Sequence, residues 1–394
     1  MPIKSIIILL LFTPCLFAQK TVVNEYVAID KIALRLPDSL TASTEKIASY
    51  IVSNFKTNNE KTRAIFIWVA SNIQYDIENM YALNFYEEQK EKITKCLNNK
   101  KGICENYAAV FNDICLKSGI KSFVITGYTK QNGFADYIPH AWCCALIDSS
   151  WFMFDPTWGS GYVSNSKFYE KINNAYFKVP PISLIKSHMP FDFLWEFLDY
   201  PVSNQEFYEG KTQLNKSKSY FNYKDSILVY EKQNHMERLR FSASRIERNG
   251  LKNSLIFDRL QHIKLEIEHL KQTKTINLYN LSVADYNDGV RGLNDFINYR
   301  NNQFSPIKTD SEIQNMIDVI SNKLNNAIAK LDQITDAGPN TMQLKTQLIK
   351  SIDDAKAQVK AQQNWLTQYF SKGKSGRKSM FYEKKITWFG IPIN

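Results

Sequence analysis

The feature that most constrains this chain is a change of pattern near residue 205, after which proline becomes rare and apolar residues follow a helical period. The clearest run steps alternately by four and three residues, as in a heptad seam: Ile313, Ile317, Ile320, Leu324, Ala327, Leu331 and Ile334. Such spacing predicts an amphipathic helix that packs against other helices through one face. The second half of the chain is therefore predicted to be all-helical.

Boundary signals surround this seam. Thr309 and Glu312 form the pattern of a capping box before it, and Gly338-Pro339 ends it. A second helix follows, so the two are predicted to form a coiled-coil-like helical hairpin. The apolar face of this second helix is made by Leu344, Leu348, Ile352, Ala355 and Val359.

Asparagine recurs every seven residues on an earlier predicted helix, at Asn280, Asn287, Asn294 and Asn301. The stripe either lines a polar groove or forms hydrogen bonds between helices. We favour the second interpretation, because a buried asparagine is a known way to set the register of packed helices.

The first half of the chain mixes helix and strand signals. Residues 64–70 are almost continuously apolar, which predicts a buried helix over 61–72. Apolar residues at steps of three and four after Cys104 predict a second helix that ends near Lys117, before Gly119. Residues 121–128 are β-branched and aromatic and predict a strand, and 129–138 a loop.

A hairpin is predicted next, with strands over 140–147 and 151–155. His140 begins the first strand and Asp155 ends the second, so antiparallel pairing makes them neighbours. Cys104 lies 36 residues before His140, which lies 15 residues before Asp155. Both intervals fit one arrangement, with Cys104 at a helix N-terminus facing the open end of the hairpin.

These three groups are the parts of an activated sulfur nucleophile. The thiol of Cys104 attacks, the imidazole of His140 takes its proton, and the carboxylate of Asp155 holds the imidazole in the right tautomer. A helix N-terminus and a nearby imidazolium also favour the thiolate form of a cysteine. The spacing therefore predicts a Cys-His-Asp catalytic triad.

The motifs that carry these residues resemble a known family. They are Gly-x-Cys-x-x-Tyr-Ala (102–108), His-Ala-Trp (140–142) and Asp-Pro-Thr-Trp (155–158). In this order they resemble the transglutaminase-like superfamily, and more closely its bacterial members related to the kyphoscoliosis peptidase, over roughly residues 60–200. The resemblance takes in the runs 73–76, 176–181 and 187–190. It implies an α+β, papain-like core, with a helix packed on an antiparallel sheet, that carries the triad.

Further site residues follow from the resemblance. It implies an oxyanion hole built with a tryptophan upstream of the cysteine, and Trp68 is the only one nearby, although its apolar helix favours a core position. The backbone N–H of Cys104 is the preferred donor. Tyr107, Trp142 and Trp158 are expected in the substrate cleft. No calcium-binding loop is evident, and the five histidines show no metal-ligand spacing, so no metal and no cofactor are predicted.

The domain organisation is predicted in four parts: a signal peptide (1–18), a transglutaminase-like domain (19–204), a helical domain (205–370) and a basic tail (371–394). Lys4, the apolar run 6–12 and the small residue Ala18 have the layout of a secretory signal, so export to the periplasm or the extracellular space is expected after cleavage near Ala18. No later stretch reaches the ~18 apolar residues of a transmembrane helix.

Cysteine usage fits an exported thiol enzyme. The mature chain would keep five cysteines, and an odd number leaves at least one thiol free. Cys115 is interpreted as a small core residue. A disulfide from Cys96 to Cys143 or Cys144 remains open, as does the oligomeric state.

A formal net charge of +10 invites a nucleic-acid partner, but its distribution argues against one. Much of the excess lies in the tail, at Lys372, Lys374, Arg377, Lys378, Lys384 and Lys385. We interpret the tail as a solubilising end rather than as a segment that binds an anionic surface.

The sequence thus predicts an exported hydrolase, a cysteine peptidase or transglutaminase-like acyltransferase that acts on an amide through a thioester. Water is favoured over an amine as acceptor, which favours a peptidase or deamidase over a cross-linking enzyme. The partner would be a protein or peptide, or a component of the cell envelope. The alternative is a non-catalytic envelope-binding protein that uses the helical domain. An arylamine N-acetyltransferase-like enzyme is disfavoured, because its acyl-CoA donor is cytoplasmic.

Overall fold

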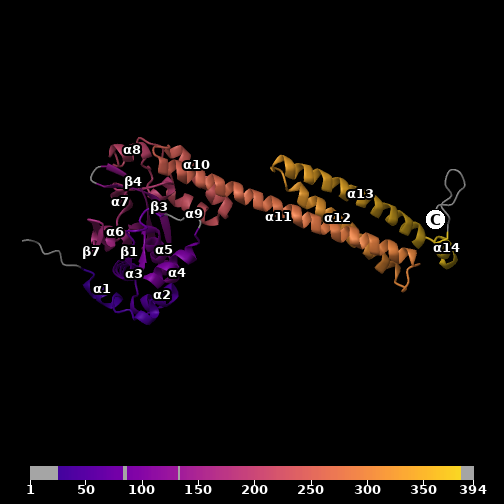
Figure 1. Ribbon diagram of the computed structural model, residues 1–394, viewed down its shortest axis with the longest axis horizontal. Helices are drawn as coiled ribbons and strands as arrows, with labels where there is room; N and C mark the ends of the chain where they lie inside the picture. Colours follow the sequence, from indigo (N-terminus) through magenta and orange to yellow (C-terminus); the bar gives the residue numbers. More distant parts are fainter. Residues whose placement is uncertain (1–24, 83–86, 132–133, 383–394) are drawn as a thin grey trace, which may run out of the picture. The chain divides into compact units, whose positions relative to one another are not determined.

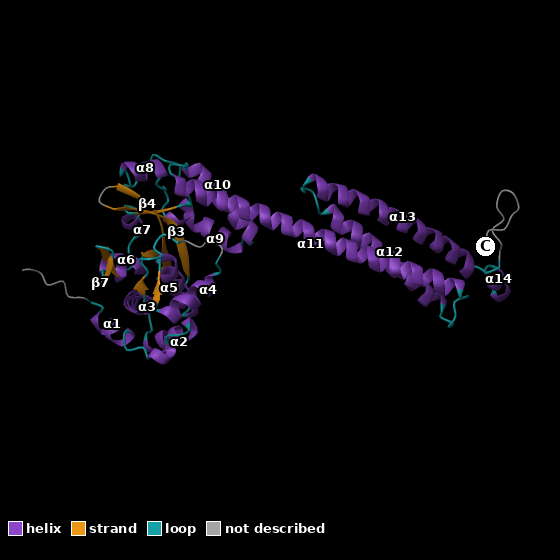
Figure 2. Ribbon diagram, in the orientation of Figure 1, coloured by secondary structure: helices purple, strands orange, loops and turns teal. Residues whose placement is uncertain are grey.

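The computed structural model describes residues 25–82, 87–131 and 134–382, with only the backbone for 134–138. The chain divides into two compact units, Met1–Gln261 and His262–Asn394, and the division falls inside α11 (Ser254–Asn301). The fold class is α+β, as predicted, and every described strand belongs to the first unit (Figure 2). The predicted signal peptide lies outside the described residues, and the predicted domain boundaries stay predictions.

A four-stranded antiparallel sheet forms the centre of the first unit, where Figure 1 labels its strands β3 and β4. The strand order is β5-β4-β3-β8. Its strands are β3 (Ser122–Gln131), β4 (Phe134–Ile147), β5 (Ser150–Phe154) and β8 (His188–Pro190). The predicted β4–β5 hairpin is confirmed. Asp148 and Ser149 form its turn with positive φ values of 49° and 67°, as tight hairpin turns require.

The prediction of a loop over residues 129–138 was wrong. Strand β3 continues to Gln131, and β4 begins at Phe134. The register of the two strands shifts after Tyr128, which lies opposite Pro139. Because proline cannot donate a backbone hydrogen bond, it is tolerated in a sheet at such an irregularity. Pro139 therefore marks a local defect within a long hairpin instead of its end.

Helices cover one face of the sheet: α2 (Thr44–Asn54), α3 (Asn58–Asn72), α4 (Gln89–Asn99) and α5 (Cys104–Lys117). Helix α3 begins at a Thr57–Glu60 capping box. Alternate residues of β4 (Ala141, Cys143, Ala145 and Ile147) join the core on this side. Trp142 and Cys144 join a second cluster, with residues of α7 (Pro181–Leu184), η3 (Phe193–Glu196) and α9 (Tyr223–Lys232). Because successive side chains of β4 point to opposite faces of the sheet, this strand contributes to both cores.

The remaining elements of the first unit are short, apart from α10. They are α1 (Val27–Ala33), η1 (Asp38–Leu40), β1 (Gln74–Tyr75), β2 (Lys101–Gly102), α6 (Pro156–Ser160), β6 (Gly161–Ser164), β7 (Lys167–Glu170), η2 (Asn174–Tyr176), α8 (Asn204–Glu209) and α10 (His235–Asn249).

The five described cysteines are buried and unpaired. Cys115 is fully buried in the core, as predicted. Cys143 donates from its thiol to the carbonyl of Ala108 in α5, 3.2 Å away, so it ties the sheet to that helix.

The second unit contains the larger part of α11, α12 (Asp310–Asp332), α13 (Pro339–Phe370) and α14 (Lys374–Ser379). The predicted seam residues are all buried, and the Thr309–Glu312 capping box is present. Small residues of α11 allow α12 to approach closely. Ser282 donates to the carbonyl of Ala327 at 2.8 Å, and a Cβ at Gly289 would lie 2.7 Å from Leu324.

Two predictions for this unit were wrong. Leu344 is exposed, although the other residues predicted on its face are buried. The four asparagines of the stripe are also exposed, so they do not fix helix register from a buried position. The seven-residue repeat places them on one side of α11, and the small residues Ser282 and Gly289 occupy the buried side instead.

The described part of the basic tail is not merely a solvated end. The guanidinium of Arg377 donates to both carboxylate oxygens of Asp310 at 2.7 Å and lies 4.9 Å from the ring centre of Tyr369. Lys384 and Lys385 lie outside the described residues. Among the helices that the structure describes, none is both long and apolar enough to cross a membrane.

Gly127 controls how closely β8 lies against β3. It pairs with His140 on one side and with Pro190 on the other. A Cβ at this position would lie 2.1 Å from the carbonyl oxygen of Met189 and 2.7 Å from the Trp142 ring. The strand contact requires a glycine here.

We therefore expect Gly127→Ala to lower the free energy of unfolding by about 1–3 kcal/mol, because the neighbouring strand must move. Urea denaturation followed by tryptophan fluorescence measures the change. Gln131→Ala, at the exposed end of β3, is the control and should cost less than about 0.5 kcal/mol. Equal stability of Gly127→Ala and the wild type would show that β8 is not held this closely.

Candidate active site

Cys104 is the first residue of α5 and is only 3% exposed. The turn before it is fixed by Asn106, whose side-chain oxygen accepts from the N–H of Ile103 at 2.9 Å. Strand β1 pairs in parallel with β2, which places Tyr75 beside Gly102. Because the first N–H groups of a helix have no partner within it, the thiol lies at a partly positive end.

His140 and Asp155 are joined by a hydrogen bond of 2.8 Å between Nε2 and Oδ2. Asp155 follows β5 directly and caps the N-terminus of α6, where its Oδ1 accepts from the N–H groups of Thr157 and Trp158 at 2.9 and 3.1 Å. The carboxylate is fully buried. The neighbourhood predicted from the hairpin is present, and Asp155 has a second role as a helix cap.

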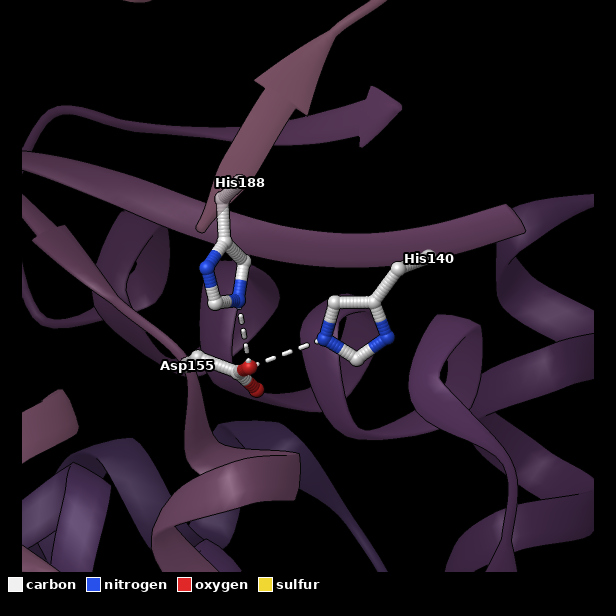
Figure 3. Close-up of side chains that lie close together, drawn as sticks. All are labelled: His140, Asp155 and His188. Carbon is white, nitrogen blue, oxygen red and sulfur yellow. Dashed lines mark hydrogen bonds and ion pairs between the residues drawn. The ribbon is translucent and has the colours of Figure 1, made fainter. Parts of the chain in front are cut away.

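A second histidine, His188 of β8, also reaches Asp155 (Figure 3). Its Nε2 lies 3.0 Å from Oδ2, and its Nδ1 lies 2.8 Å from the hydroxyl of Ser187. The two imidazoles approach the carboxylate from different strands. The sequence pattern indicated no role for His188, because this residue lies 33 residues after Asp155 and only the pairing of β8 with β3 brings it close.

Asp155, His140 and His188 all have shifted pKa values. Burial alone would raise the pKa of Asp155, but the charge of His140 and hydrogen bonds from both histidines hold it well below its usual range. Burial lowers the pKa of His188, so this ring is neutral. The carboxylate is therefore ionised, with one neutral imidazole beside it.

Burial would also lower the pKa of His140, but interactions with Asp155 and Cys104 outweigh it and raise the pKa above its usual range. The contribution of Cys104 includes a side-chain hydrogen bond. Because Nε2 of His140 is used by Asp155, Nδ1 is the nitrogen left to face the thiol. The arrangement favours an imidazolium held between a carboxylate and a sulfur.

A cleft of about 530 Å³ opens beside these groups, and Cys104 and His140 both line it. Aromatic residues form much of the rest of its wall: Tyr75, Trp158, Tyr162, Phe168 and Tyr176. Trp158, predicted in the cleft, lies there with its ring centre 5.5 Å from that of His140. Tyr162 and Phe168 come from the small β6–β7 hairpin.

Three other aromatic residues named from the sequence are buried. Trp68 is buried in the main core under Lys100, the position that its apolar helix favoured. Because it is not among the residues that line the cleft, we do not keep it as a candidate oxyanion donor. Tyr107 is also fully buried, and its hydroxyl donates to the carbonyl of Ile73. Trp142 packs in the second core beneath His188. All three side chains pack inside the protein and are not among the residues that line this cleft.

His140, Asp155 and His188 also present possible metal-ligand atoms within 4.8 Å of one another. However, both Nε2 atoms face the same carboxylate oxygen at hydrogen-bond distances. An ion bound here would have to break both hydrogen bonds. We therefore treat the cluster as a hydrogen-bonded site.

Comparison with known proteins identifies a domain. Residues 45–156 match the model of the transglutaminase-like superfamily. The chain is 31% identical over 191 residues to the kyphoscoliosis peptidase of Mus musculus, covering 44% of this chain and 28% of that protein. It is 32% identical over 171 residues to the kyphoscoliosis peptidase of Homo sapiens, covering 41% and 25%. The chain thus spans about a quarter of the length of these relatives.

Among solved structures, the periplasmic domain of TgpA from Pseudomonas aeruginosa is similar at 17% identity, with a TM-score of 0.24. The match covers 33% of this chain and 46% of that one. The family match of residues 45–156 agrees with the expected resemblance, whereas the catalytic roles of individual residues stay predictions.

The charges in this site predict a pH-dependent stability. Asp155, with its pKa lowered, stabilises the folded state above the unfolded pKa of about 4, and this contribution is lost as the pH falls. His140, with its pKa raised, stabilises the folded state fully below about pH 6.5, and this contribution is lost as the pH rises.

The difference in unfolding free energy between the wild type and Asp155→Asn should therefore be largest between about pH 4 and pH 6.5 and shrink on both sides. Urea denaturation at a series of pH values measures it. Asp148→Asn, at an exposed turn position that asparagine also tolerates, is the matched control and should show a small difference throughout. A difference for Asp155→Asn that does not vary with pH would contradict the assignment.

Proposed function

Because residues 45–156 match the transglutaminase-like superfamily, we propose that this protein is a thiol enzyme that acts on a carboxamide or peptide bond through a thioester. The observation that supports this most directly is the placement of His140, which is hydrogen-bonded to buried Asp155 and lines the same cleft as Cys104. The helix end at Cys104 adds a positive field that favours a thiolate.

In the proposed reaction, the thiol proton of Cys104 passes to Nδ1 of His140, and Sγ attacks the carbonyl carbon of the substrate. The tetrahedral intermediate collapses, the C–N bond breaks, and His140 gives its proton to the leaving amine. The acyl group then remains on sulfur as a thioester. Asp155 keeps the imidazole in place and stabilises its positive form throughout.

The negative oxygen of the intermediate needs donors. We assign the backbone N–H of Cys104 as one of them. Tyr75 replaces Trp68 as the second candidate, because it lines the cleft beside Cys104. Burial, followed by the charges of Cys104 and Asp155, raises the pKa of Tyr75, so its hydroxyl keeps the proton that it would donate.

Water is the proposed acceptor of the acyl group, with His140 as its general base, which gives a peptidase or deamidase. The substrate is proposed to be a protein or peptide, because the cleft combines aromatic walls with polar residues such as Thr129 and Gln131. Export remains part of the proposal and rests on the leader-like pattern of residues 1–18.

We expect iodoacetamide at pH 7 to modify Cys104 about tenfold or more faster than each of the four other described cysteines, as measured by peptide mass mapping over time. An ordinary thiol is only about 3% ionised at this pH, whereas an imidazolium-paired thiol is largely thiolate. Cys96, Cys115, Cys143 and Cys144 serve as internal references, because all are buried and burial raises the pKa of each.

Exposure alone could separate these rates, so His140→Ala is the decisive control. The smaller side chain leaves Cys104 at least as accessible but removes its proton acceptor, and labelling should slow by about tenfold. If Cys104 reacts equally fast in this variant and the wild type, its thiol is not activated by His140. The non-catalytic alternative, a binding protein of the cell envelope, would then be favoured.

A further inference from the structure

The second imidazole on Asp155 has no step in the proposed reaction. We propose that His188 is a positioning residue, which holds Oδ2 of Asp155 so that the carboxylate stays aligned with His140. This inference rests on the proposed function and assigns a further residue to the same site. His188 does not line the cleft with Cys104, so it would act only through Asp155.

The ring of His188 is fixed by its surroundings. The residue is buried in β8, where it pairs with Thr129 of β3. Trp158 and Trp142 meet the ring edge to face, with centre distances of 4.6 and 5.1 Å. Such packing leaves an imidazole little freedom to turn. Its Nε2 points at the carboxylate of Asp155, as Figure 3 shows.

The hydrogen bonds also determine the tautomer of His188. Ionised Oδ2 of Asp155 carries no proton, so the proton in the 3.0 Å bond must belong to Nε2 of His188. Nδ1 of the neutral ring is then an acceptor, and the hydroxyl of Ser187 donates to it at 2.8 Å. The same hydroxyl lies farther, 3.3 Å, from the carbonyl of Leu184. Ser187 thereby keeps the Nε2 proton directed at Asp155.

Both carboxylate oxygens of Asp155 accept hydrogen bonds in this arrangement. Two backbone N–H groups hold Oδ1, and two imidazoles hold Oδ2. Without His188, Oδ2 keeps only His140, and the carboxylate can rotate about its side-chain bonds toward a less favourable angle. Because His188 is neutral, it adds a hydrogen bond without adding a charge that would compete with the His140 imidazolium.

Other titratable groups also surround this chain of hydrogen bonds. Tyr75 from β1, Tyr176 from η2 and Cys143 from β4 all interact electrostatically with Asp155. Burial, as the main cause, raises the pKa of each. All three are therefore uncharged near neutral pH and would not produce a transition there.

The experiment compares two amide replacements in the full chain, His188→Gln and His188→Asn. The Nε2 donor of glutamine can occupy the position of the imidazole Nε2, whereas the asparagine donor is one bond shorter and cannot reach Oδ2. The measured quantity is the rate of Cys104 alkylation by iodoacetamide as a function of pH, with circular dichroism to confirm that each variant is folded.

We expect the midpoint of the alkylation profile to rise by about one pH unit in His188→Asn and to stay within about 0.3 unit of the wild type in His188→Gln. A purely structural role would lower the stability of both variants and leave both midpoints unchanged. Ser187→Ala provides a milder variant and should shift the midpoint upward by a smaller amount. This variant decides the question if His188→Asn does not fold.

Unchanged midpoints in His188→Asn and Ser187→Ala would overturn the role of His188, while a low midpoint in the wild type would leave the proposed function intact. A wild-type profile of an ordinary thiol, with its midpoint near 8.5, would instead contradict the proposed function itself. The two failures are therefore distinguishable in one set of measurements.

Discussion

The buried carboxylate of Asp155 is the interaction on which the site depends. An ionised carboxylate removed from water is very costly unless hydrogen bonds or opposite charges compensate it. Here four donors do so: two backbone N–H groups of α6 and the Nε2 atoms of His140 and His188. Each donor comes from an element that the fold must place correctly, so one side chain connects α6, β4 and β8.

The rest of the first unit can be understood as the support for this charge. The β4–β5 hairpin brings His140 to Asp155, and β3 carries β8 on its other edge, with Gly127 allowing the close approach. Helix α5 packs on the sheet through the core that it shares with α2, α3 and α4, and it presents Cys104 at its first turn. The second unit has a separate core, built around the buried seam of α12.

The predictable part of the site was the part set by short-range rules. A hairpin with a tight turn fixes which residues face each other, so the nearness of His140 and Asp155 followed from spacing. The extent of α5 followed from the apolar period that begins at Cys104 and from Gly119, which lies just beyond its end. His188 could not be found in this way, because a three-residue strand has no distinctive pattern and its register with β3 is non-local. Tyr107 and Trp142, which were expected in the cleft and are buried, show a second limit, since an aromatic side chain suits a core and a cleft equally well. The exposed Asn280 to Asn301 stripe shows that a seven-residue period alone does not say which side of a helix is buried.

The most direct test of the proposed thioester chemistry is to trap an acyl group on Cys104. The purified full chain would be mixed with a peptide pool, quenched in acid and digested, and the mass of the peptide containing Cys104 measured with and without neutral hydroxylamine, which cleaves thioesters. We expect an added acyl mass on Cys104 that hydroxylamine removes and that is absent in His140→Ala. An adduct of equal amount in His140→Ala, or acylation at a different cysteine, would contradict it.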